Sequence, residues 1–460
     1  MHRIMAVLVC LALGVMAHAT EPEADSTSKP RDWTATASMP AVEAHQAAAA
    51  EPITPAVVSA TDYPSIQAAV EAHAGQMIFV PSGDYLVSEK IRLHTDGSGL
   101  YGPGRIIQQN ADQPIIEIEN ASGVEVRDLT LTRREGNCVT NCEGILALHC
   151  EGLVIENVRV IDNRSRAAGI SLRDCRGARI NRCLVRNYMR VTVDDRTGDA
   201  NWGYAFNCTD GTGIAVNRST GTLIESNRVI EENLRPTPEI QKQHKLGEWV
   251  KKTPLKGRLL NQQVWDAAHT DNWQQGSAIV VTAPEVSDLT RILGNHIENA
   301  AQGIDLHCDH AIVANNVVVN SFMGMKAMHG SRNVLITGNQ FIKNTLWAIG
   351  LMPGVTSSTT NMDGGSIIAN NIISDFGHGD AHWIWGSEHS PIRFDHGQEP
   401  DDPPLSDVII QGNLLYSPGV PRYRYAVRIE GEPNAPRGLH FSNNIFPAGS
   451  SGISNAELKP

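Results

Sequence analysis

The chain has 460 residues, and 38 lysines and arginines against 50 aspartates and glutamates give a formal net charge of −12. Apolar residues make up 41% of it, which is enough for a large core and excludes an intrinsically disordered protein. Its acidic balance disfavours nucleic acid as a partner, and no apolar run long enough to span a membrane follows the N-terminus.

The first 19 residues have the pattern of a secretory signal peptide. A basic start, Met1-His2-Arg3, precedes the apolar stretch 4–17, and Ala17-His18-Ala19 has the small-x-small form of a cleavage site. We therefore expect cleavage after Ala19 and a secreted or periplasmic protein. Residues 20–60 are rich in Ala, Pro, Glu, Ser and Thr and predict a flexible linker, followed by a single folded domain over 61–460.

Export permits disulfide bonds, and seven cysteines follow the cleavage site. An odd number leaves at least one thiol free or paired between chains. Cys138 and Cys142 flank a short turn and are the candidates for a bridge. The sequence leaves the pairing of the others open.

A short motif recurs along the chain, in which an apolar strand ends in Asn and a second apolar step follows. Counted at the Asn or its equivalent, the copies lie at positions 128, 157, 182, 227, 295, 316, 339, 371, 413 and 444. The shortest spacings are 21, 23 and 25 residues, and longer ones indicate inserted loops. A unit of two or three short strands cannot bury its apolar face alone, so the copies must stack. Asn suits the tight turns because it tolerates left-handed geometry, and stacked amides can hydrogen-bond between units.

These repeats predict an all-β, right-handed parallel β-helix. Segment 65–73 (SIQAAVEAH), with Ile66, Ala69 and Val70 on one side, predicts a helix that covers the N-terminal end of the coil. This helix, the strand 77–87 (MIFVPSGDYLV) and the Asn ladder resemble the pectate-lyase-like β-helix superfamily over about residues 61–446. The resemblance implies the fold and leaves the chemistry open, because that architecture hosts lyases, hydrolases, epimerases and phage tailspikes.

Two long insertions are predicted, at about 231–275 and 374–404. Within 241–258, six basic residues accompany one acid, which gives a local charge of +5 on an acidic protein. This segment is either a solvated helical face or a wall that attracts an anionic polymer.

Strands that begin with Gly indicate which side chains point out of the coil, because side chains alternate along a strand. In GIDLH (303–307) and GMKAM (324–328), the second and fourth residues face the core and the third and fifth face outward. Asp305 and Lys326 are therefore predicted side by side, with His307 on the same face and His329 just beyond. The pair is either an exposed ion pair without function or the centre of a sugar site.

A lyase acting on a uronic-acid polymer must neutralise the sugar carboxylate, remove the C5 proton and protonate the leaving oxygen. Lys326 or His307 is the candidate base and His329 the candidate acid. Asp305 would orient them or hold a Ca²⁺ ion, which is the cofactor that the sequence favours.

Residues of the segment 305–309 are also candidates for two other activities. The run 305–309 (DLHCD) resembles the Asp-Pro-His-Asp motif of mannuronan C5-epimerases, and this resemblance implies a role for Asp305 and His307 only, because Leu306 replaces the proline and a cysteine is added. A glycoside hydrolase needs two carboxylates about 5–9.5 Å apart. Asp305 with Asp309, or a pair that includes Asp194, Asp195 or Asp380, could supply them.

Acidic and histidine residues in the loops are candidate metal ligands, and tryptophans are candidates for substrate binding. A Ca²⁺ ion could be held by Asp194, Asp195 and Asp199, and a Zn²⁺ ion by His378, Asp380 and His382. Sugars stack on aromatic rings, and most tryptophans lie in or beside the insertions, where some serve only to pack them onto the coil. The residues predicted to bind substrate are Trp202, Trp347, Trp383, Trp385 and Arg332.

The sequence therefore predicts an exported β-helix enzyme whose partner is an anionic polysaccharide, with a lyase on a uronate polymer as the first hypothesis. A glycoside hydrolase or fructan-transferring enzyme is the alternative. A C5-epimerase and a non-catalytic carbohydrate-binding protein are the further alternatives.

Overall fold

The computed structural model describes residues 57–191, 209–232, 276–284, 286–328, 330–354, 363–379, 389–397, 402–432 and 434–460. The predicted signal peptide, nearly all of the predicted linker, nearly all of the predicted insertion 231–275, and residues 380–388 and 398–401 of the predicted insertion 374–404 lie outside these ranges. The rest of the second insertion is described, and its residues Ser390–Phe394 form a strand of the coil rather than a loop. The coil belongs to the compact unit Ala56–Pro460. No helix within the described ranges has the length and apolar character needed to cross a membrane.

Three parallel sheets make up the coil, and each successive coil adds one strand to each sheet. The 13-stranded sheet contains β1 (Val58–Ser59), β2 (Met77–Phe79), β5 (Gly99–Tyr101), β8 (Glu125–Arg127), β12 (Val154–Glu156), β16 (Arg179–Asn181), β21 (Leu223–Glu225), β24 (Arg291–Leu293), β27 (Ile312–Ala314), β30 (Leu335–Thr337), β33 (Ile367–Ala369), β36 (Ser406–Gln411) and β39 (Arg437–Ser442). The 12-stranded sheet contains β4 (Ile91–Leu93), β7 (Ile116–Glu119), β11 (Ile145–Leu148), β15 (Ile170–Arg173), β20 (Ile214–Asn217), β23 (Ser277–Thr282), β26 (Gln302–Leu306), β29 (Met323–Met328), β32 (Trp347–Met352), β35 (Ser390–Phe394), β38 (Tyr425–Ile429) and β40 (Gly452–Ser454).

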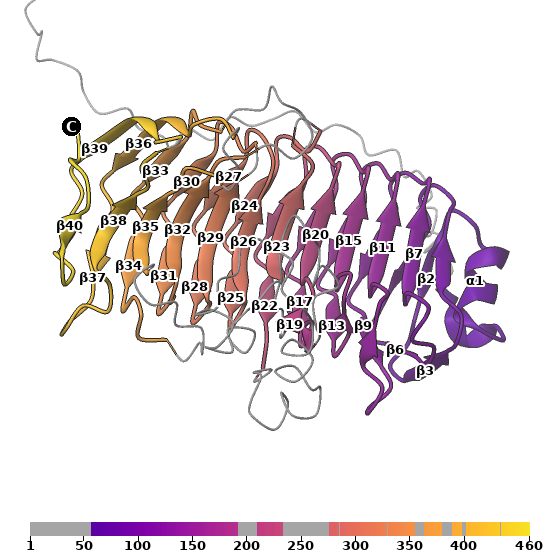
Figure 1. Cartoon of the computed structure of the whole chain (residues 1–460). Helices are drawn as coiled ribbons and strands as arrows, with labels where there is room; N and C mark the ends of the chain where they lie inside the picture. The colour runs from indigo at the N-terminus through magenta and orange to yellow at the C-terminus, as the bar shows by residue number, and fades with distance from the viewer. Residues whose placement is uncertain are drawn as a thin grey trace, which may run out of the picture. The chain divides into compact units, whose positions relative to one another are not determined.

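The third sheet and the minor elements complete the described chain. The 11-stranded sheet contains β3 (Asp84–Val87), β6 (Arg105–Gln108), β9 (Thr130–Arg133), β13 (Arg159–Ile161), β17 (Leu184–Arg186), β22 (Arg228–Ile230), β25 (His296–Glu298), β28 (Val317–Val319), β31 (Gln340–Ile342), β34 (Ile372–Ser374) and β37 (Leu414–Tyr416). The minor pairs are β10 (Val139–Thr140) with β14 (Arg164–Ser165), in parallel, and β18 (Arg190–Val191) with β19 (Thr209–Asp210), antiparallel. The strands follow one another along the coil from the indigo end to the yellow end in Figure 1, which confirms the predicted parallel β-helix.

Residues 57–60, at the end of the segment that the sequence assigned to the linker, are folded. Val58 in β1 lies opposite Ile78 in β2 and packs against the core, so pairing with the first full coil orders this segment. The short helix η1 (Ala60–Asp62) follows it.

The predicted N-terminal helix is α1 (Ile66–Ala72), which lies at the indigo end of the coil in Figure 1. The Ser65 hydroxyl caps it by accepting a hydrogen bond from the backbone N–H of Ala68 at 3.1 Å. Its buried residues are Ile66, Ala69 and Val70, as the pattern predicted.

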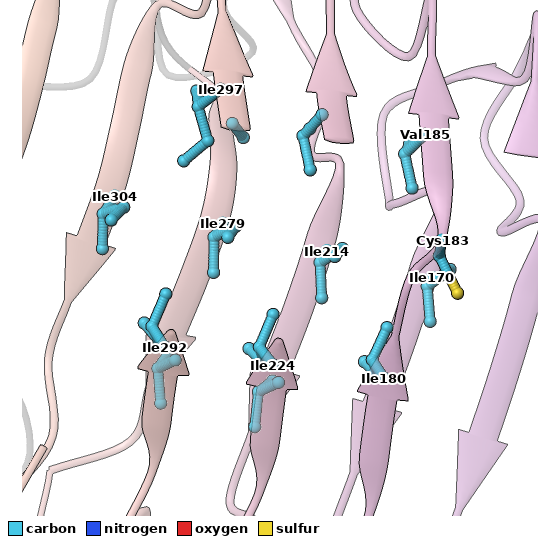
Figure 2. Packing of buried hydrophobic residues seen from close by; sticks show 14 of the residues in the cluster. Ile170, Ile180, Cys183, Val185, Ile214, Ile224, Ile279, Ile292, Ile297 and Ile304 are labelled. Carbon is cyan, nitrogen blue, oxygen red and sulfur yellow. The ribbon is translucent and has the colours of Figure 1, made fainter. Parts of the chain in front are cut away.

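Identical apolar side chains stack from coil to coil in the core. Figure 2 shows one such row in the 12-stranded sheet, formed by Ile170, Ile214, Ile279 and Ile304, which are register partners in adjacent strands. All four are fully buried. Branched side chains stacked at the strand spacing of about 4.8 Å pack against one another, so the side chains of one coil favour similar side chains in the next.

A buried row of asparagines runs along one turn of the coil. Asn295 Nδ2 donates to Asn316 Oδ1 at 2.9 Å and to the carbonyl of Ile224 in the preceding coil at 3.0 Å. The backbone N–H of Asn295 donates to the same Asn316 oxygen at 2.9 Å. Repetition of this amide contact links Asn227, Asn295, Asn316, Asn339, Asn371, Asn413 and Asn444.

The repeated Asn was expected both to adopt left-handed geometry and to hydrogen-bond between coils, and these two roles fall on adjacent residues. In the later coils the left-handed residue precedes the ladder Asn, as at Asn315 (φ 57°) before Asn316. Asn157 (φ 52°) occupies this left-handed position, and the ladder position beside it is the buried Val158. The positions 128, 157 and 182 that the sequence assigned to the repeat are therefore left-handed residues, each one place before the ladder position. Asn suits both the left-handed and the ladder position, so the sequence alone did not separate them.

The candidate bridge between Cys138 and Cys142 is not present. Six cysteines lie in the described ranges and all six are free thiols. Cys138 and Cys142 are partly exposed, and the others are buried in the core.

Candidate functional site

The predicted neighbours Asp305 and Lys326 lie directly opposite each other on adjacent strands. β26 carries Asp305 and β29 carries Lys326, and the two are register partners in the 12-stranded sheet. Ile304 and Leu306, on either side of Asp305, are fully buried in the core. Alternation along the strand therefore turns the Asp305 carboxylate to the outer face, as predicted.

Asp305, Lys326 and His307 form a compact group, which we call the charged cluster. The Lys326 Nζ lies 3.4 Å from Asp305 Oδ2, and the His307 Nε2 lies 3.0 Å from Asp305 Oδ1. The Ser277 hydroxyl, on β23, donates to Asp305 Oδ2 at 3.3 Å. One carboxylate thus contacts an ammonium, an imidazole and a hydroxyl group that come from three adjacent coils.

The charged cluster is recessed, which excludes the exposed ion pair considered from the sequence. The side chains of Asp305, Lys326 and His307 are only 9%, 13% and 16% exposed. Burial opposes ionisation of the Asp305 carboxyl, but the charges of Lys326 and His307 more than offset it and hold its pKa well below the usual range. Asp305 is therefore a fixed negative charge that orients two cationic or proton-carrying groups.

Trp347 lies one coil further along the sheet, next to the register position of Lys326. Its indole lies over Gly350, the register partner of Lys326, since a Cβ at Gly350 would come within 2.6 Å of the indole Cε3. The guanidinium carbon of Arg393 lies 5.1 Å from the centroid of the ring. Trp347 is only 5% exposed, so it is packed on the sheet and does not offer an open face for sugar stacking.

Arg332 lies on the turn after β29 and is bound to Asp309. Its Nε is 3.1 Å from both carboxylate oxygens, and Nη2 makes a further short contact with Oδ2. Asp309 itself is buried. Arg332 and Asp309 therefore form an ion pair beside the strand that carries Asp305, and their predicted roles in substrate binding and in a hydrolase carboxylate pair stay predictions.

Several predicted residues lie outside the described ranges, and their roles stay predictions. They are Asp194, Asp195, Asp199, Trp202, His329, Asp380, His382, Trp383 and Trp385. Among the residues that the structure does describe, no group of three His, Cys, Asp or Glu side chains is arranged to hold a metal ion. The proposed Ca²⁺ and Zn²⁺ sites therefore remain untested.

The sequence analysis missed a second set of charged residues on the same outer face. Arg393 in β35 and Arg428 in β38 continue the row of Asp305, Lys326 and Gly350. The strand of Arg393 begins with Ser-Pro, so a search for strands that open with Gly does not find it. Ile392 and Phe394, on either side of Arg393, are apolar and buried, and this alternation could have revealed that Arg393 faces outward.

Comparison with known proteins supports the fold and does not identify a family. No protein-family model matches the chain, and no curated protein matches it. Among solved structures, it is similar to the Dettilon tailspike protein gp208, with 15% identity, 85% of this chain and 67% of that chain covered, and a TM-score of 0.55.

Two enzymes share the same architecture. The alginate lyase AlyF-OU02 is 10% identical, with 87% of this chain and 88% of that chain covered and a TM-score of 0.51. The catalytic domain of a GH87 α-1,3-glucanase is 11% identical, with 88% and 70% covered and a TM-score of 0.54. At these identities the likeness shows the right-handed parallel β-helix and carries no assignment of chemistry.

Proposed function

We propose that this parallel β-helix chain is a polysaccharide lyase that cleaves a uronate-containing polymer at the charged cluster. The observation that carries the proposal is a buried Asp305 carboxylate in contact with both Lys326 and His307 on the outer sheet face, where these neighbours hold its pKa low. An imidazole oriented by a carboxylate is the arrangement used for general-base catalysis. An adjacent ammonium group is suited to stabilise the negative charge that forms on a sugar carboxylate.

Each group has a distinct task in this proposal. Lys326 pairs with the substrate carboxylate and so favours removal of the neighbouring C5 proton. His307 accepts that proton on the ring nitrogen that does not face Asp305, and Asp305 stabilises the resulting imidazolium. The C5–H electron pair forms the C4=C5 double bond while the C4–O bond breaks, and an acid, for which His329 remains the candidate, protonates the leaving oxygen.

The proposal is tested with a panel of uronate-containing and neutral polysaccharides. Ultraviolet absorbance reports the C4=C5 double bond, and reducing ends report any chain cleavage. We expect both signals from the wild type, and a loss of at least about a hundredfold in kcat for His307→Ala. His310→Ala is the matched control, because His310 also pairs with a carboxylate, that of Asp288 at 2.8 Å, but is exposed on a turn.

Other outcomes have equally definite meanings. Reducing ends without ultraviolet absorbance would show a glycoside hydrolase and reject the elimination step. Full activity in His307→Ala would show that His307 is not the group that removes the C5 proton. Retention of a polymer without any cleavage would show a binding protein.

A further inference from the structure

Beyond Trp347, the outer face of the 12-stranded sheet carries a second polar group, which we call the arginine cluster. Arg393 contacts Asp395 through Nη2 at 2.8 Å and Glu430 at 3.3 Å. The Arg428 Nε contacts the same Glu430 oxygen at 2.6 Å. The cluster thus consists of two guanidinium and two carboxylate groups on adjacent coils, and none of it takes part in the proposed elimination.

The arginine cluster is aligned with the charged cluster. Lys326, Gly350, Arg393 and Arg428 occupy one outward row in the successive strands β29, β32, β35 and β38. Lys326 and Arg393 are two strands apart, or about 9.6 Å at the usual strand spacing. Gly350 leaves no side chain between them, and the Trp347 indole fills that gap. A polymer lying along the row would meet both clusters.

Two buried polar atoms next to the arginine cluster lack hydrogen bonds. Trp347 and Ser390 are register partners, 5% and 0% exposed. Within the described ranges, the Trp347 Nε1 and the Ser390 Oγ have no hydrogen-bond partner. Buried polar groups are nearly always paired in folded proteins, so atoms that lack partners beside a recessed polar cluster indicate a place for a polar ligand.

We propose that the arginine cluster binds an uncharged sugar unit, so that the substrate is a mixed polymer with both uronate and neutral residues. This inference rests on the proposed function, because it places the uronate at the charged cluster. The four groups of the arginine cluster sum to zero charge. A second uronate carboxylate there would have to compete with Asp395 and Glu430 for the guanidinium groups. Sugar hydroxyls donate and accept, so they can bind carboxylates and guanidiniums without breaking the ion pairs.

The inference predicts a substrate preference that shifts when the charge of the arginine cluster is changed. The wild type is expected to have a higher kcat/KM on polymers that combine uronate and neutral units than on alginate or polygalacturonate. Arg428→Gln is expected to raise KM on the mixed polymer about tenfold or more with little change in kcat, because it removes binding contacts away from the reacting atoms. Glu430→Gln leaves the cluster with a net positive charge, so the ratio of kcat/KM should shift toward the homopolymers.

A matched variant and a second readout complete the experiment. Glu225→Gln, on the outer face of the 13-stranded sheet, makes the same chemical change away from both clusters and should leave the ratio unchanged. Higher wild-type activity on alginate or polygalacturonate, or an unchanged ratio in Glu430→Gln, would overturn the inference. Affinity electrophoresis in gels that contain each polymer measures binding without turnover. Altered retardation of Arg428→Gln and Glu430→Gln with no cleavage by the wild type would therefore reject the lyase and keep the subsite.

Discussion

At the scale of single residues, the most consequential side chain is Asp305. It stands in a strand whose neighbouring side chains are buried in the core, and it is itself almost wholly enclosed. An isolated buried carboxylate would be protonated, but the contacts with Lys326 and His307 keep this one ionised. Its charge therefore contributes to the stability of the fold as well as to the proposed site.

Asp305→Asn is expected to lower the free energy of unfolding at pH 7 by about 3 kcal/mol, because it leaves Lys326 without its carboxylate. The folded-state pKa of Asp305 lies below the unfolded value of about 3.9. The stabilisation is thus fully present above pH 3.9 and is lost as the pH falls through the folded-state pKa. Urea unfolding of both proteins between pH 8 and pH 2 measures the difference.

Asp288→Asn is the matched control for this titration. Asp288 also contacts an imidazole, that of His310 at 2.8 Å, but both side chains are exposed. The control should therefore change stability by less than about 1 kcal/mol. A difference between the wild type and Asp305→Asn that grows on acidification would contradict the assignment of Asp305 as an ionised carboxylate.

At the scale of structural elements, the asparagine ladder holds successive coils at one turn. Each amide inside the ladder accepts from the previous coil and donates to the next, so no interior ladder amide is left without partners. The ladder starts only at Asn227, whose Oδ1 accepts the backbone N–H of Cys183 at 2.8 Å. Earlier coils place apolar residues at this position, so they lack this set of bonds.

Asn339→Ala tests the ladder at its centre. The change removes the acceptor used by the Asn316 amide and backbone N–H and the donor used by the Val313 carbonyl. Leaving these buried groups unpaired should lower the free energy of unfolding by about 3 kcal/mol. Asn181→Ala, in a partly exposed strand position, is the control and should cost less than about 1 kcal/mol. Equal effects of the two changes in denaturant unfolding would show that the ladder adds no specific stability.

At the scale of the whole coil, a continuous apolar core runs along the described strands. Four of the six described cysteines are buried in it, and burial raises the pKa of the Cys183 thiol to about 12. A thiol that is both enclosed and protonated reacts slowly. Enclosure and protonation should therefore protect Cys183 as long as the coil stays folded. The hydrogen bond with Cys175 lowers the pKa of Cys150, so its protection depends on enclosure alone.

Alkylation followed by peptide mapping measures this protection. Among the described cysteines, Cys138 and Cys142 should be modified first in the native protein, because they alone are partly exposed. The buried thiols Cys150, Cys175, Cys183 and Cys308 should react only after denaturation. Recovery of Cys138 and Cys142 as a cross-linked peptide from a non-reduced digest would contradict the free thiols of the structure. Native labelling of Cys183 would contradict its enclosure in the core.

The sequence by itself determined the β-helix and the juxtaposition of Asp305 with Lys326. Both follow from periodicity, since a repeat of about 21 residues requires stacking and alternation assigns each strand residue to a face. The tertiary structure alone decided that this pair is recessed, that Trp347 lies flat over Gly350, and that Arg393 and Arg428 extend the same row. Those facts depend on which coils become neighbours, because insertions of unequal length separate residues in the chain that the stacking of strands brings together in space.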